Sequence, residues 1–84
     1  MKVIDKKSLT PEKWAEIKYP AFIQQDTDGE WGAWYPDLGM GLFFMFGKDP
    51  NEAMERLEKV RIEKYDFLMS SKTEIPEPTY YGFL

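Results

Sequence analysis

The chain has 84 residues, with 15 acidic and 11 basic side chains and neither histidine nor cysteine. This length accommodates one small domain. The missing cysteine and histidine exclude disulfides, zinc fingers and imidazole-based catalysis. Because small secreted domains usually depend on disulfides, the composition favours a reducing, cytoplasmic setting.

The acidic excess is concentrated in the middle third of the chain. Residues 19–47 contain four acids, no lysine or arginine, and eight of the 14 aromatic residues. The acids of this window are Asp26, Asp28, Glu30 and Asp37. A formal net charge of −4 argues against direct binding of nucleic acid, whereas an acidic, aromatic-rich segment suits a basic protein partner.

Neither a targeting segment nor a membrane span is expected. Residues 1–7 are polar and basic and lack the apolar core of a signal peptide. The longest apolar run, Leu42–Phe46, has five residues, whereas a helix that spans a membrane needs about 20.

Residues 1–18 are interpreted as an N-terminal extension with one short helix. Thr10 is a suitable N-cap, and Pro11 fits the first helical position. Pro20 disfavours a helical backbone at the preceding residue, so the main domain, residues 19–84, should begin with a strand.

A hairpin is predicted next. The Asp28-Gly29 pair lies between two apolar stretches, which is a strong turn signal and predicts strands over 21–25 and 30–35. Alternation along the second strand places Trp31, Ala33 and Tyr35 on one face, as expected core under a helix. Trp34 lies on the opposite face and is therefore the better candidate for contact with a partner.

Residues 42–46 form the third predicted strand, after a glycine-rich bend at 39–41. Its apolar side chains alternate between two sets, Leu42, Phe44 and Phe46 on one face and Phe43 and Met45 on the other. A single helix covers only one face of a sheet, and we expect the face of Phe43 and Met45 to need another cover. The extension, the C-terminal tail, a second protomer or a different partner could each provide it.

One long helix is the clearest element. Asp49 is placed as its N-cap and Pro50 as its first residue. The helix should run to about Met69, and its apolar stripe consists of Ala53, Leu57, Val60 and Leu68. After a rigid proline segment at 75–78, residues 80–84 should form a short final strand or a docking tail.

These elements predict an α+β fold of two layers. It consists of a three-stranded antiparallel meander, one long helix and a short C-terminal strand.

The order of several short motifs resembles the HicB-type antitoxins. The family pattern has a YPA-like strand, a D-G turn, an FPDL motif and a G-x-T-x-E-E-A entry into a helix. The corresponding segments here are Tyr19-Pro20-Ala21, Asp28-Gly29-Glu30-Trp31, Tyr35-Pro36-Asp37-Leu38, Gly47–Ala53 and the proline segment 75–78. The resemblance covers residues 19–79, and the ordered set is more specific than any one motif.

The resemblance implies a truncated ribonuclease-H-like β-β-β-α-β unit without catalytic activity. Members of the family neutralise HicA, a small basic toxin that cleaves mRNA, by protein–protein contact. We therefore expect a non-enzymatic antitoxin with a HicA-like partner, no cofactor, no catalytic or metal-binding residue, and association into a homodimer or larger assembly. The expected partner-contacting residues are Asp26, Asp28, Glu30, Trp34, Asp37, Phe43 and Met45.

The chain departs from the family pattern at several places. Gly39-Met40-Gly41 replaces the usual Pro-Gly-Cys, and residues 1–18 precede a strand that commonly lies near the N-terminus. No DNA-binding module is expected in the six residues after Pro78. These departures keep a second hypothesis open, an orphan HicB-like module that self-associates and has no cognate toxin.

Two other interpretations are less favoured. The four acids Asp26, Asp28, Glu30 and Asp37 could bind a divalent metal for nuclease chemistry. Asp26 and Asp28 also suit a turn, however, and no second element supplies the remaining inward carboxylates. The aromatic side chains could stack single-stranded bases, but the window has no cation to neutralise phosphate.

Overall fold

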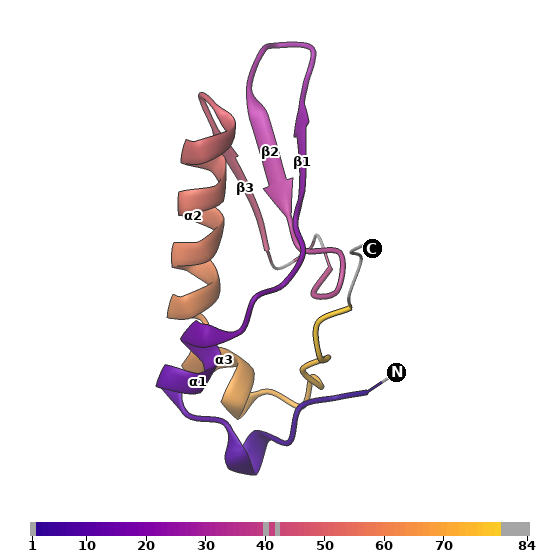
Figure 1. The fold of residues 1–84 in the computed structure, drawn as a ribbon, viewed down its shortest axis with the longest axis vertical. Coiled ribbons are helices and arrows are strands. Elements are labelled where there is room, and N and C mark those ends of the chain that lie inside the picture. The colour runs from indigo at the N-terminus through magenta and orange to yellow at the C-terminus, as the bar shows by residue number, and fades with distance from the viewer. Residues whose placement is uncertain (1, 40, 42, 80–84) are drawn as a thin grey trace.

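The computed structural model describes residues 2–39, 41 and 43–79. Three strands form one antiparallel sheet in the order β1 (Phe22–Gln25), β2 (Trp31–Trp34) and β3 (Phe44–Gly47). The helices are η1 (Lys6–Ser8), α1 (Pro11–Glu16), α2 (Pro50–Glu63) and α3 (Tyr65–Ser70). The predicted α+β class and three-stranded meander are confirmed (Figure 1).

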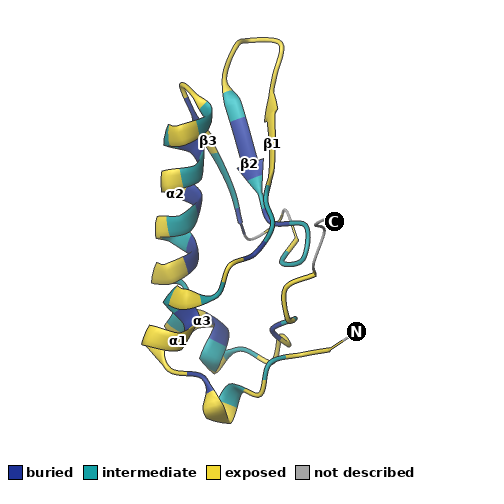
Figure 2. Ribbon diagram, in the orientation of Figure 1, coloured by how far each residue is buried: buried dark blue, intermediate teal, exposed yellow. Residues whose placement is uncertain are grey.

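Helix α2 lies along one face of the sheet, which we call the inner face, and packs against β2 and β3. Its buried residues are turned toward the sheet, and its exposed residues point away (Figure 2). Helices α1 and α3 lie beyond the end of the sheet, near the C-terminal end of α2 (Figure 1). The buried apolar core consists of Leu9, Trp14, Tyr19, Ala33, Tyr35, Phe43, Ala53, Leu57, Leu68 and Ile75.

The hairpin between β1 and β2 forms where the sequence predicts it. Oδ1 of Asp26 accepts hydrogen bonds from the backbone N–H groups of Asp28 at 2.8 Å and Glu30 at 3.1 Å. Gly29 has a φ of 91°, a conformation that glycine adopts without steric cost. The turn is therefore held by the side chain of its own first residue.

The two faces of β3 are the reverse of those expected. Ala33 pairs with Met45 and Trp34 pairs with Phe44. Because residues directly opposite each other share a face, Met45 lies with Ala33 on the inner face, where it packs against the core. Phe43 is completely buried in that core. The expectation that Phe43 and Met45 need a further cover is wrong, since the pairing register assigns them to the face that α2 covers.

The long predicted helix is interrupted. Its N-terminus is as expected, because Oδ1 of Asp49 accepts from the N–H of Glu52 at 2.8 Å. The expected single helix to Met69 is wrong, since α2 ends at Glu63 and Lys64, with a ψ of 8°, separates it from α3. Leu68 on α3 is buried in the core.

The N-terminal segment packs into the same core as the rest of the chain. Trp14 is fully buried, and Thr10 caps α1 through a hydrogen bond from the N–H of Lys13. The segment also pairs with the region after α3, since the N–H of Ile4 donates to the carbonyl of Ile75 at 2.7 Å. The predicted final strand, residues 80–84, lies outside the described residues.

Within the described part of the chain, none of the helices is both long enough and apolar enough to cross a membrane.

Candidate functional site

Four aromatic side chains cross the outer face of the sheet, the face opposite α2. We call them the aromatic strip: Phe22, Trp34, Phe44 and Phe46. Phe22 meets Trp34 edge-on at a centroid distance of 5.6 Å, and Trp34 stacks on Phe44 at 5.4 Å. Phe44 and Phe46 are 5.0 Å apart in a T-shaped arrangement. Phe46 remains 45% exposed, so the strip offers apolar area at the surface of the sheet.

The strip follows from the pairing of the three strands. Phe22 and Phe44 lie opposite Trp34 on either side, so the indole occupies the middle of the sheet. Gly32 leaves space for the ring of Phe44, because a Cβ atom at position 32 would lie 2.9 Å from Cζ of Phe44. The glycine thus lets a phenylalanine of β3 lie across β2.

The acidic hairpin borders the strip. Asp26 lines a shallow depression of about 210 Å³ together with strip residues of β2 and β3. Asp28 and Glu30 belong to the same turn and are exposed. Three predicted acids and Trp34 therefore lie on or beside one surface. This combination of exposed aromatic area and neighbouring carboxylates can bind a protein surface of opposite charge.

Asp37, the fourth predicted acid, does not join this group. It follows the other end of β2, and its carboxylate accepts hydrogen bonds from the backbone N–H of Thr79 at 2.8 Å and from its hydroxyl at 2.7 Å. Its role in the structure is to fix the segment after α3. Among residues 2–39, 41 and 43–79, no three acidic side chains come together in a group that could hold a metal ion.

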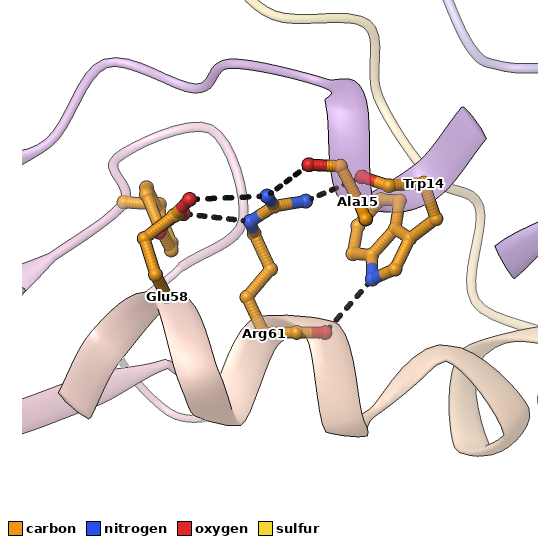
Figure 3. A network of polar contacts seen from close by, with 5 residues as sticks. Trp14, Ala15, Glu58 and Arg61 are labelled. Carbon is orange, nitrogen blue, oxygen red and sulfur yellow. Dashed lines mark hydrogen bonds and ion pairs between the residues drawn. The ribbon is translucent and has the colours of Figure 1, made fainter. Parts of the chain in front are cut away.

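A buried polar cluster lies at the other end of the molecule, between α1 and α2 (Figure 3). The side chain of Arg61 is completely buried, and it donates to the carbonyl of Trp14 at 2.8 Å and to Glu58 at 3.0 Å. Its guanidinium lies 5.0 Å from the ring centroid of Trp14 and within 6 Å of the rings of Tyr19 and Tyr35. The burial of Arg61 is not expected from its residue type, although its spacing from Ala53 and Leu57 places it on the buried stripe of α2.

The pKa values in this cluster reflect burial and pairing. Burial raises the pKa of Tyr19 to about 12. Burial, with the hydrogen bond to Glu58, also raises the pKa of Tyr35. Partial burial alone would raise the pKa of Glu58, but hydrogen bonds from Arg61 and Tyr35 outweigh it and leave this pKa below its ordinary value.

The buried part of the cluster is fully paired. Every buried polar side-chain atom in the described residues has a hydrogen-bond partner. The cluster fixes α1 against α2, whereas the aromatic strip is open at the surface.

Comparisons of the chain with protein-family models, with curated proteins and with solved structures find no significant match.

Proposed function

We propose that this protein is a HicB-like antitoxin domain, which binds and neutralises a small, basic, mRNA-cleaving toxin of the HicA type. The observation that carries the proposal is the aromatic strip with the acidic hairpin beside it. The ordered motifs of residues 19–79 support the choice of family.

The two parts of this surface have different tasks. Aromatic side chains that become desolvated at the centre of an interface supply most of the binding energy. Carboxylates at its border mainly accelerate the encounter with a basic partner and select against acidic ones. A variant of the strip should therefore weaken the complex, and a variant of the hairpin acids should slow its formation.

The first experiment is co-expression with the small basic protein encoded by the neighbouring gene. We expect the wild-type chain to rescue growth and Phe46→Glu to lose the rescue, because a carboxylate in the strip would be buried against the toxin. Phe67→Glu is the matched control, since Phe67 is similarly exposed at 51% but lies on α3. Failure of the wild-type chain to rescue, or equal rescue by both variants, contradicts the proposal.

The second experiment measures association kinetics with the same purified partner. Asp28→Asn and Glu30→Gln together should lower the association rate about tenfold at low salt and leave the dissociation rate nearly unchanged. The difference from wild type should shrink as ionic strength rises, because salt screens exposed charges. An unchanged association rate shows that the hairpin does not face the toxin.

A further inference from the structure

The shallow depression beside the acidic hairpin lies where β2 lacks a side chain. Gly32 is two residues from Trp34 and therefore belongs to the same outer face of the sheet. Its partners across the strands are Gln24 on β1 and Phe46 on β3. The depression of about 210 Å³ has the volume of about seven water molecules in the liquid. It can therefore receive one long side chain of another protein.

Aromatic rings form one side of the depression. Trp34 and Phe44 are nearly parallel, with an interplanar angle of 10° and a centroid distance of 5.4 Å. Phe46 is tilted by 62° against Phe44 and is 45% exposed. The faces of such rings attract a cation that comes within about 6 Å of their centroids. This side of the depression can thus bind a flat cation by stacking.

Oxygen acceptors form the other side. Asp26 lines the depression, and the two hydrogen bonds that its carboxylate accepts in the hairpin both end on Oδ1. Among the described residues, Oδ2 therefore keeps its capacity for a donor from outside. Gln24 also lines the depression, and within the described part of the chain its side-chain amide makes no hydrogen bond. The lining residues include one carboxylate and neither lysine nor arginine, so the depression attracts a cation.

An arginine side chain fits this arrangement better than the alternatives. Its guanidinium is planar, stacks on aromatic faces and donates from one edge to two acceptors. A lysine ammonium is compact and strongly hydrated, so it cannot cover the rings and reach both oxygens at once. An apolar side chain would cover the carboxylate of Asp26 without offering a donor, which costs free energy.

We infer that the depression at Gly32 is a subsite for one arginine side chain of a partner protein. The guanidinium stacks on the rings of Phe44 and Phe46. Its edge donates to Oδ2 of Asp26 and to the amide oxygen of Gln24. The inference rests on the proposed function, since it takes the basic toxin as the partner. It adds that one arginine of the toxin is anchored here, whereas the other hairpin acids act at a distance.

Titration of the full chain with capped amino acids tests the subsite without the toxin. N-acetyl-arginine amide should bind with a dissociation constant on the order of 1 mM. The NMR signals of the Gly32 amide and the Trp34 indole should shift on binding. The matching citrulline probe has the same shape without the charge, and the lysine probe has the charge without the planar fork. Both should bind at least about fivefold more weakly than the arginine probe.

Two variants locate the subsite. Asp26→Asn keeps Oδ1 for the turn but replaces Oδ2 by an NH₂ group, so it should weaken binding of the arginine probe at least about tenfold. Glu55→Gln is the matched control, because it removes the same charge from an exposed position on α2 and should leave the affinity unchanged. Gly32→Ala fills the depression with a methyl group and should weaken binding about fivefold or more. The amide spectrum of each variant checks that the fold is kept.

The subsite and the antitoxin function can fail separately. The absence of a saturable shift, equal affinities for the three probes, or an unchanged affinity in folded Asp26→Asn would overturn the subsite even if the chain rescues growth. A preference for the arginine probe that Asp26→Asn and Gly32→Ala both abolish supports the subsite even if co-expression shows no rescue. In that second case the antitoxin proposal alone is contradicted.

Discussion

Arg61 shows how one buried charge can be accommodated in a small core. Burial by itself would lower the pKa of its guanidinium, but the hydrogen bond and charge of Glu58 raise the pKa above its ordinary value. Backbone carbonyls of Trp14 and Ala15 accept its remaining bonds. Aromatic rings surround the cation, so apolar packing and charge pairing meet at a single side chain.

Arg61→Met should therefore destabilise the protein by about 2–4 kcal/mol, because it removes the partner of a buried carbonyl and of a partly buried carboxylate. Urea unfolding followed by tryptophan fluorescence measures the loss. Arg56→Met is the control, since that side chain is 52% exposed and its ion pair with Glu52 should contribute less than about 1 kcal/mol. An equal loss in the free energy of unfolding for the two variants would show that the buried contacts of Arg61 do not stabilise the protein more than those of Arg56.

Tyr19 makes stability sensitive to alkaline pH. Burial raises its folded-state pKa to about 12, so the folded state keeps a proton that the unfolded chain releases near pH 10. Its contribution to stability is fully present below about pH 10 and is lost as pH rises through about 12. Tyr19→Phe should make the free energy of unfolding less dependent on pH in this window, as measured by urea titrations at several pH values. A slope identical to that of wild type would contradict the assignment.

At the scale of the elements, the turn from β3 into α2 depends on close approach of two backbones. A Cβ atom at Gly47 would lie 2.4 Å from the backbone nitrogen of Ala53 and 2.9 Å from its Cα. Helix α2 could move away only by losing its contact with the sheet. Glycine at this position therefore sets the distance between the two layers.

Gly47→Ala should destabilise the protein by about 2–3 kcal/mol, the cost of overpacking against a backbone that cannot yield. The control is Gly41→Ala, where the added methyl group would meet no atom within 4 Å apart from its chain neighbours, and its effect should stay within about 0.5 kcal/mol. Thermal unfolding of the two variants side by side makes the comparison. A stable Gly47→Ala would mean that α2 can shift on the sheet without loss.

At the scale of the whole molecule, the N-terminal segment completes the core. Leu9 and Trp14 are buried with residues of the sheet and of α2. The indole N–H of Trp14 donates to the carbonyl of Arg61 at 2.8 Å, and the hydroxyl of Tyr65 donates to the carbonyl of Leu9 at 2.9 Å. The free energy of unfolding of a small domain is low, so the loss of these contacts is a large fraction of it.

A chain shortened to residues 19–84 should therefore show no cooperative thermal transition and poor dispersion in its NMR spectrum, because Arg61 and its aromatic neighbours would be exposed. Trp14→Phe in the full chain is a less disruptive change than the truncation. It keeps most of the apolar area, loses one buried hydrogen bond, and should cost about 1–2 kcal/mol. A well-dispersed spectrum of the shortened chain would show that residues 1–18 are an independent extension.

Local signals in the sequence are sufficient for the caps and the turn, but not for the interruption of the long helix at Lys64. The N-caps at Thr10 and Asp49 and the Asp-Gly turn act between residues close in the chain, and each lies where it is predicted. Trp34 was placed on the outer face because alternation within one strand is also local. The sequence therefore predicts the indole and the hairpin acids of the candidate surface, but it does not predict that phenylalanines belong to the same surface.

The sequence by itself determined the strand–strand–strand–helix order, the turn and the acidic, aromatic middle segment, because propensity and alternation are read within a few residues. Only the tertiary structure decided which side of β3 is buried, where the long helix bends, and that Arg61 lies inside. Each of these depends on the partner across a strand or on a neighbouring helix. Phe43 and Phe44 are adjacent and chemically identical, and only the register with β2 sends one into the core and the other to the surface.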